Sequence, residues 1–333
     1  AHNRSISLVR NERYPGTRAL LDRVVFRILP EEGARLVALE TGEVDLVEGI
    51  PPDTARRLEQ DEDVVIKTTG SRRFYYLQWN CRSPWFADAP TRRALSLALD
   101  RDRMIATLLP GFASPAIGPL PPVVWNYHPA LDPDPYDPDR ARRILAEAGW
   151  EDTDGDGILE RDGRPFAIEI LTKQGDPVRE NGAVMLRTFL GDVGVDVRIR
   201  AMELAAGLEL LREGRFDAYL GRLNANLYGD PRGSVHSAAV EEFNTGRYAN
   251  AAVDSLVDLA LTIVDRKAAL PLWFEVQELL VGDPPAAYLF YPHNLVGTSA
   301  RIRDAEPHML SPINNLVEWW IAPGDRRYAS GKS

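Results

Sequence analysis

The stretch Tyr136–Thr172 decides the fold prediction, and it reads YDPDRARRILAEAGWEDTDGDGILERDGRPFAIEILT. Asp137 followed by Pro138 is typical of a helix start, because the carboxylate accepts from free backbone N–H groups and proline fits the first helical position. Gly149 is a typical helix end. After a polar turn, alternation from Phe166 onward predicts a strand. The apolar helix face comprises Ala141, Ile144, Leu145 and Ala148. The stretch therefore predicts a helix, an acidic turn and a strand.

The alternation of strands and helices continues beyond this stretch. Such a β-α-β-α-β run predicts parallel strands joined by right-handed crossovers. An earlier β-α-β pattern near the N-terminus favours parallel pairing as well. The first run has strands at 166–172, 195–199 and 216–220 with helices near 180–191 and 204–211; the earlier unit has strands at 24–28 and 44–47 around a helix from 31 to 42. The fold class is predicted to be α/β.

Several segments of the chain resemble one known family. Tyr136-Asp137-Pro138, the run LAEAGW ending at Trp150, and the run DGDGILE ending at Glu160 match a signature of the family 5 extracellular solute-binding proteins, the dipeptide- and oligopeptide-binding subunits of ABC importers. Further similar segments are TGEVDLV at 41–47, the region 80–101, the loop GPLPP at 118–122, GVDVRIR at 194–200, EGRFDAYL at 213–220 and TGRYANAAVDSLVDLA at 245–260. The resemblance spans nearly the whole chain, from about residue 8 to about 325.

The resemblance implies a fold of the periplasmic-binding-protein type II kind. It predicts one complete α/β lobe, lobe III, at 81–296. Part of lobe I is expected at 1–80, with a return to lobe I and a tail at 297–333. Because family members are longer at the N-terminus, we expect the chain to be the C-terminal fragment of such a protein, with a naturally short variant as the alternative.

The resemblance also implies a function. It predicts the solute-binding component of an ABC importer, which captures a peptide or other small solute between two lobes by a hinge motion and delivers it to the permease subunits. The protein is expected to be a monomer without catalysis or cofactor, and to be periplasmic or extracellular, membrane-anchored if it is a lipoprotein. The alternatives are a binding module for sensing that recruits a receptor, and a binder of oligosaccharides rather than peptides.

Composition agrees with a globular protein that does not bind polyanions. The 333 residues are 44% hydrophobic and 26% charged, with a formal net charge of −10. That charge argues against nucleic acid and anionic membrane surfaces as partners. Cys81 is the single cysteine, so no intrachain disulfide can form.

A polar segment after the strand expected to end at Leu220 is the main candidate binding site, because ligands of α/β sheets bind beyond the carboxyl ends of strands. It contains Arg222, Asn224, Asn226, Tyr228 and Asp230. The same segment could also be an ordinary surface loop.

The matching segment of peptide-binding members resembles W-x-a-D-y-p-D-P, whose first Asp holds the α-ammonium group of the peptide. Asp230-Pro231 is kept here, but the first acidic position falls on Leu227 or Asn226 and the Trp position on Asn224 or Leu223. A neutral side chain is a poor counter-ion for a buried ammonium group. An uncharged or sugar-like solute is therefore an open alternative to a peptide with a free amine.

Two aromatic residues, Trp125 and Tyr127, follow the loop at 118–122 and are further ligand-binding candidates. Aromatic side chains on loops either stack on a ligand or hold the loop in place. Trp150 and Trp273 are expected to lie in the core instead.

The acidic turn is a weak calcium candidate. Asp152, Asp154 and Asp156 offer oxygen donors at positions 1, 3 and 5 of a calcium loop, and Gly157 stands at position 6. Position 12, where such loops carry a bidentate Glu, is Gly163. The alternative is an ordinary Asp/Gly-rich turn that binds no ion and leads into a strand.

Enzyme motifs are missing. The five histidines are scattered without the HExxH spacing of a metal site. The sequence contains no nucleophile elbow, phosphate loop or dinucleotide fingerprint. We therefore expect no catalytic residues and no resident metal or cofactor.

Overall fold

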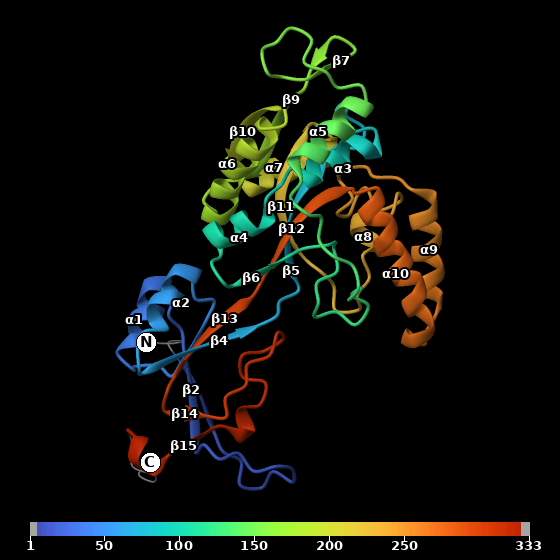
Figure 1. Ribbon diagram of the computed structural model, residues 1–333. Helices are drawn as coiled ribbons and strands as arrows, with labels where there is room; N and C mark the ends of the chain where they lie inside the picture. The colour runs from blue at the N-terminus through green and yellow to red at the C-terminus, as the bar shows by residue number, and fades with distance from the viewer. Residues whose placement is uncertain (1–4, 328–333) are drawn as a thin grey trace. The chain divides into compact units, whose positions relative to one another are not determined.

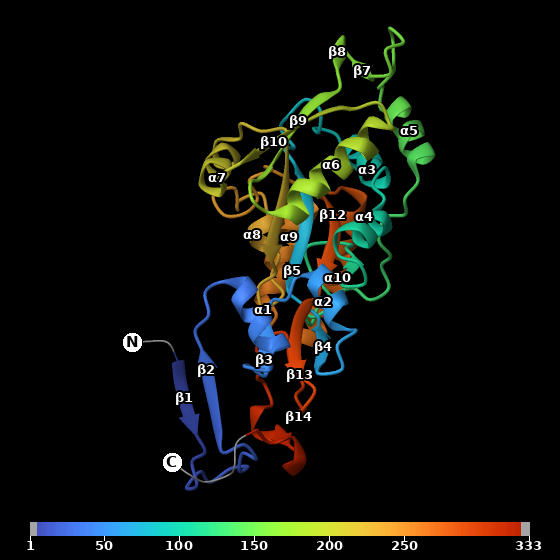
Figure 2. The same cartoon turned by 90° about the vertical axis from the view of Figure 1, so that its left-hand side faces the viewer.

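The computed structural model describes residues 5–327, and its chain forms two compact units (Figures 1 and 2). Unit 1 comprises the residues before Arg72 and those after Pro292, and unit 2 comprises Arg72–Pro292. The expected lobe boundaries at 80/81 and 296/297 divide the chain at other positions, so the assignment of these units to lobes I and III stays a prediction. The predicted tail at 328–333 lies outside the described residues.

Unit 2 is built on one six-stranded sheet with the strand order β10-β9-β11-β5-β12-β6. β10 and β11 both pair with β9 in parallel, so the predicted β-α-β-α-β run is confirmed. β5 is antiparallel to its neighbours β11 and β12. The bounds are β5 Arg73–Trp79, β6 Ala113–Pro115, β9 Ala167–Lys173, β10 Asp196–Met202, β11 Ala218–Asn224 and β12 Ala286–Pro292.

Helices cover both faces of this sheet. The largest core cluster lies between one sheet face and α3, α4, α5 and α6, and a smaller one between the other face and α7. Two neighbouring helices, α9 and α10, pack on each other around a separate core with α8 (Figure 1). The helices are α3 Ala89–Leu97, α4 Arg101–Leu108, α5 Pro138–Glu147, α6 Pro177–Gly191, α7 Leu204–Glu213, α8 Arg232–Val235, α9 Ala251–Thr262 and α10 Arg266–Gly282.

The opening stretch folds as predicted. The Oδ1 of Asp137 accepts a hydrogen bond from the backbone N of Arg140 at 2.8 Å, and α5 begins at Pro138. Gly149 has φ +84° and ends the helix. Trp150 is only 1% exposed and stacks on Phe166 with ring centroids 4.1 Å apart, which confirms its place in the core. The acidic turn then leads through the short strands β7 Glu160–Arg161 and β8 Arg164–Pro165 into β9.

Unit 1 carries a three-stranded antiparallel sheet in the order β3-β13-β4 and a separate β1–β2 hairpin, which Figure 2 shows clearly. The expected parallel pairing of the strands near 24–28 and 44–47 is wrong. β2 pairs with β1, and β3 pairs with β13 from the far end of the chain. The bounds are β1 Ser5–Val9, β2 Arg23–Arg27, α1 Glu32–Glu40, β3 Leu46–Glu48, α2 Pro52–Leu58, β4 Val64–Thr69, β13 Asn294–Ser299, β14 Ile302–Arg303, η1 Leu316–Glu318, β15 Trp320–Ile321 and η2 Pro323–Asp325.

No helix among residues 5–327 is both long enough and apolar enough to cross a membrane.

Candidate functional site

The candidate site lies at the edge of the unit 2 sheet where β9, β10, β11 and β12 end. Because β5 runs antiparallel to β11, it begins at this same edge. The expectation that the strand stops at Leu220 is wrong, since β11 continues to Asn224. Its added residues Arg222 and Asn224 lie opposite Tyr75 and Arg73 of β5. Pairing with β5 therefore places both side chains in the sheet rather than in a loop.

Arg73, Arg222 and Asn224 project from one face of the sheet, because residues opposite each other in an antiparallel pair share a face. On the same face, Tyr75 and Leu220 lie further from this edge and belong to the main hydrophobic core. Arg222 and Asn224 are exposed and Arg73 is half-buried. The polar group thus begins where the core ends.

The loop after β11 is fixed by its own hydrogen bonds together with hydrogen bonds from neighbouring segments. The Nδ2 of Asn226 donates to the carbonyl oxygen of Asp230 at 2.9 Å, and its Oδ1 accepts from the backbone N of Asp230 at 2.9 Å. The Oδ1 of Asp230 accepts from the backbone N of Arg232 at 2.8 Å. The backbone of Ala225 bonds to the carbonyl oxygen of Arg72 at 2.7 Å. Asn226 and Asp230 therefore shape the loop, in addition to any contact with a solute.

Trp125 holds this loop from the side. Its Nε1 donates to the carbonyl oxygen of Tyr228 at 2.7 Å, and the Arg266 guanidinium lies 5.2 Å from the centre of its ring. The neighbouring Asn126 donates through Nδ2 to the carbonyl oxygen of Gly229 at 2.7 Å. Tyr228 itself is left 79% exposed. Trp125 thus holds the loop, while Tyr228 presents an aromatic surface to solvent.

Tyr127 packs at the margin of a core cluster that includes Phe74 and Tyr76 and also Ala225, the first residue of the loop. Burial raises the pKa of its phenol, and the charge of Asp132 adds to that effect. The structure therefore brings Trp125 to the loop through a hydrogen bond, and it places Tyr127 at the cluster that holds Ala225. The assignment of Tyr127 to the binding site stays a prediction. Trp273 is buried in the core of α8, α9 and α10, as predicted.

Two features of this site were not predicted from the sequence. Arg73 was not predicted, because its place beside Arg222 depends on the pairing of β5 with β11 across about 150 residues of chain. Burial lowers the pKa of the Arg73 guanidinium, and the positive charge of Arg222 lowers it further. The supporting role of Asn126 was missed as well; the adjoining Trp125 was the only local signal.

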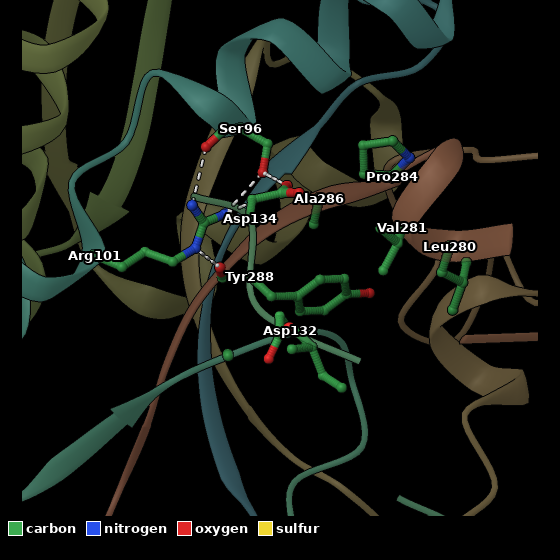
Figure 3. A pocket seen from close by; sticks show the side chains of 11 residues that line it. Ser96, Arg101, Asp132, Asp134, Leu280, Val281, Pro284, Ala286 and Tyr288 are labelled. Atoms are coloured by element: carbon green, nitrogen blue, oxygen red, sulfur yellow. Dashed lines mark hydrogen bonds and ion pairs between the residues drawn. The ribbon is translucent and has the colours of Figure 1, made fainter. Parts of the chain in front are cut away.

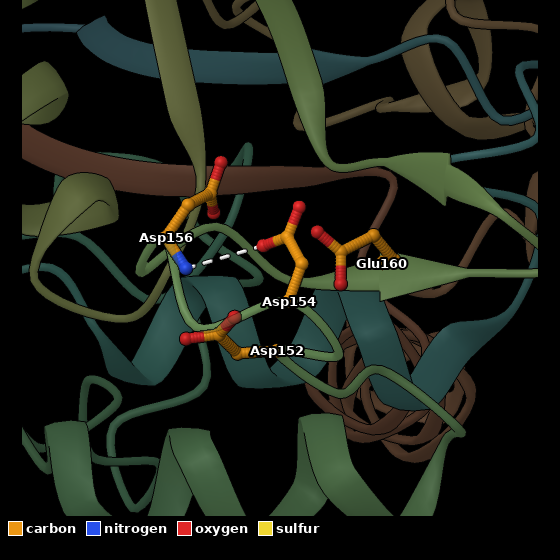
Figure 4. A group of neighbouring side chains, drawn as sticks. All are labelled: Asp152, Asp154, Asp156 and Glu160. Carbon is orange, nitrogen blue, oxygen red and sulfur yellow. Dashed lines mark hydrogen bonds between the residues drawn. The ribbon is translucent and has the colours of Figure 1, made fainter.

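The acidic turn gathers Asp152, Asp154, Asp156 and also Glu160 (Figure 4). One carboxylate oxygen from each lies within 4.8 Å of the others. The same carboxylates accept backbone hydrogen bonds within the turn, from Gly155 to Asp152 at 2.7 Å and from Thr153 to Glu160 at 2.8 Å. Glu160 stands at position 9 of the calcium-loop pattern rather than at 12. These hydrogen bonds hold the carboxylates in an ordinary Asp/Gly-rich turn, which needs no bound ion.

A small hollow in unit 2 is lined by a network of buried polar side chains (Figure 3). Arg101 donates to the carbonyl oxygen of Tyr288 at 2.7 Å and to the Oγ of Ser96 at 2.8 Å, and Ser96 donates to Asp134 at 2.7 Å. Burial lowers the pKa of Arg101 to about 10. The remaining space holds about one water molecule. The network ties α3 and α4 to β12.

The sequence and structure match known solute-binding proteins. A family model described as "Bacterial extracellular solute-binding proteins, family 5 Middle" matches residues 1–242. The chain belongs to this family. The family consists of solute-binding proteins of the periplasm or the extracellular space and not of enzymes, which agrees with the prediction of a non-catalytic role.

Individual relatives bind different solutes. The chain is 30% identical to the oligopeptide-binding protein AppA of Bacillus subtilis over 95% of its length and 59% of AppA. It is 25% identical to heme-binding protein A of Haemophilus influenzae over 85% of its length and 51% of that relative. The structure of B. subtilis AppA in complex with a nonapeptide matches with a TM-score of 0.75, over 97% of this chain and 65% of AppA. The chain thus spans between half and two thirds of these proteins.

Proposed function

We propose that the chain is part of the solute-binding component of an ABC importer, which captures a peptide or other small solute and delivers it to permease subunits in the membrane. The family membership carries this proposal, and the polar edge of the unit 2 sheet supports it. We further propose that unit 1 corresponds to part of lobe I and unit 2 to lobe III. The protein would act as a monomer outside the cytoplasm, with lipoprotein anchoring as one way to stay at the membrane.

Three exposed side chains are proposed to contact the solute. Arg222 offers a charged guanidinium, Asn224 an amide and Tyr228 an aromatic ring. Binding sites for small molecules combine such polar groups with aromatic surface. Trp125, Asn226 and Asp230 are proposed to hold the loop in the geometry that this contact needs.

We propose that the solute is not held through a free amine, which is how peptide-binding members hold the N-terminus of a peptide. That acidic position falls on Asn226 or Leu227 here, and the amide of Asn226 is bonded to Asp230. The local site therefore offers no carboxylate at this position. The proposed solute is either a peptide that binds through groups other than its amine or an oligosaccharide.

A thermal-shift panel tests the proposed function. The panel contains mixed tetrapeptides, maltotetraose, cellotetraose, heme and nickel–histidine, each at millimolar or saturating concentration. A compound that binds only the folded protein raises the melting temperature, by an amount that grows with concentration above its Kd. A concentration-dependent shift with at least one compound supports solute binding. A melting temperature that stays constant with every compound of the panel contradicts solute binding.

A further inference from the structure

A glutamine on α10 holds the chain segment that lies beside the candidate loop. Gln277 is only 3% exposed. Its Oε1 accepts from the backbone N of His128 at 3.1 Å, and its Nε2 donates to the carbonyl oxygen of Asn126 at 2.9 Å. The same Nε2 donates to the carbonyl oxygen of Trp273, one turn earlier on α10, at 2.9 Å. Gln277 therefore fixes residues 126–128 against α10.

Asn126 links this fixed segment to the loop 226–230. Its Nδ2 donates to the carbonyl oxygen of Gly229 at 2.7 Å, beside the bond from Trp125 to the carbonyl oxygen of Tyr228. Two consecutive carbonyl oxygens of the loop are therefore held by two consecutive side chains of the segment. Asn126 is 0% exposed, so its side chain, like that of Gln277, is shielded from any solute.

The second polar atom of the Asn126 side chain is unsatisfied. Its Oδ1 is buried and has no hydrogen-bond partner among the residues that the structure describes. This oxygen faces Gly229, where any Cβ would overlap with it. A buried polar atom without a partner costs free energy, which offsets the gain from the Nδ2 bond. The side chain therefore adds little to overall stability, and its effect is concentrated at the loop.

We propose that Asn126 and Gln277 are positioning residues that set the conformation of the loop 226–230 before a solute arrives. This inference rests on the proposed solute-binding function, and it adds two residues on which affinity depends although neither contacts the solute. A loop that is already ordered in the free protein loses less conformational entropy when a solute binds. Loosening the loop should therefore weaken binding, even though Tyr228 and the other contacting side chains are unchanged.

Substitutions at two positions separate positioning from overall stability. Asn126→Ala removes the bond to Gly229, and Gln277→Met removes the bonds to residues 126 and 128 while it keeps an unbranched side chain. Asn126→Ser is a milder second variant, because its shorter side chain withdraws the donor from Gly229 but leaves a polar group. Thr91→Val is the matched control: Thr91 on α3 is also 0% exposed, and its Oγ1 accepts from the Nε1 of Trp150 at 3.0 Å.

Hydrogen exchange of the solute-free protein gives the first measurement. The reporting amides are those of Gly229 and Asp230, which donate to Asn226 within the loop. Their exchange should be about tenfold faster in the variants at 126 and 277, because about one hydrogen bond's worth of local stability is lost, and unchanged in Thr91→Val. Urea unfolding gives the overall stability of each variant. Loop exchange that stays at the wild-type rate, or that rises equally in Thr91→Val, overturns the proposal.

Affinity gives the second measurement. Titration calorimetry uses mixed tetrapeptides, maltotetraose, cellotetraose, heme and nickel–histidine with the wild type and each variant. A compound that binds the wild type should bind the variants at 126 and 277 about tenfold more weakly, and Thr91→Val as tightly. Equal affinity for wild type and variants overturns the proposal, because a purely structural role leaves affinity unchanged. If no compound binds the wild type, the proposed function fails, and the exchange rates still decide whether Asn126 and Gln277 set the loop.

Discussion

Asn226 and Asp230 close the candidate loop on itself through two hydrogen bonds of 2.9 Å, one in each direction between the Asn226 amide and the Asp230 backbone. An aspartate at 226 could accept one of these bonds but could not donate the other. The amide is therefore the side chain that this loop conformation requires. Position 226 is one of the two positions, with Leu227, at which the acidic residue of peptide-binding members is expected, and the loop holds an amide there.

Replacing Asn226 by alanine should lower the free energy of unfolding by about 1 kcal/mol, because two hydrogen bonds at an exposed position are lost. Asn224→Ala is the matched control, since Asn224 is an exposed amide two residues earlier, and its effect should stay within about 0.5 kcal/mol. Urea unfolding followed by fluorescence measures both. Equal losses for the two variants would contradict the role assigned to Asn226.

Gly229 has φ +72°, and a Cβ built there would lie 2.1 Å from the Oδ1 of Asn126. Gly229→Ala should therefore destabilise the protein by about 1–3 kcal/mol through backbone strain and a forced shift of Asn126. Gly33→Ala is the control, because Gly33 lies in the first turn of α1 with open space around it and a helix favours alanine. The control should leave the unfolding midpoint unchanged or raise it. A midpoint for Gly229→Ala that matches the wild type would show that the loop relaxes freely.

Arg92 is buried and binds Asp283, and its Nε donates to the carbonyl oxygen of Pro284 at 3.0 Å. Arg92→Ala leaves Asp283 without its charge partner, so a loss of about 3–5 kcal/mol is expected. The exposed pair between Arg142 and Asp139 gives the contrast, and Arg142→Ala should cost less than about 1 kcal/mol. Chemical denaturation of both variants measures the difference. Comparable losses would contradict the buried character of the Arg92 pair.

Burial raises the pKa of Cys81 to about 11 from an ordinary value of 9.0. At pH 8 the thiolate fraction is then roughly 100-fold lower than for a free thiol, so DTNB should label the native protein slowly and the urea-unfolded protein fast. The raised pKa favours the folded state below pH 9, and this contribution is lost as pH rises from 9 through 11. Native labelling as fast as that of the unfolded chain would contradict the burial of this thiol.

Local signals predicted the regular parts of unit 2 well. The cap at Asp137, the glycine at 149 and the alternation after Phe166 lie within a few residues of the elements that they specify, so α5 and β9 formed where expected. Pairings between distant segments could not be inferred in this way. β3 pairs with β13, about 250 residues later, and no local pattern distinguishes that partner from β2.

The candidate site was predicted in part for the same reason. The polar residues after Leu220 were found because they follow an apolar strand, but polar side chains hid the continuation of β11 to Asn224. Arg73 lies at the site only because β5 pairs with β11 in this register, which sequence spacing does not reveal. Likewise, the bonds of Asn226 and Trp125 within the loop separate supporting side chains from exposed ones, and residue type alone does not make that distinction.

Hydrogen exchange tests most directly the central claim that a solute binds at the carboxyl edge of the unit 2 sheet. Backbone exchange is measured by mass spectrometry for the protein alone and with the compound that gives the largest thermal shift. We expect increased protection in the proteolytic fragments that cover residues 222–230 and the start of β5 at Arg73, with no comparable change in the acidic turn at 152–160. A bound solute that leaves 222–230 and Arg73 unprotected, or that protects only segments elsewhere, would show that the solute binds at another place.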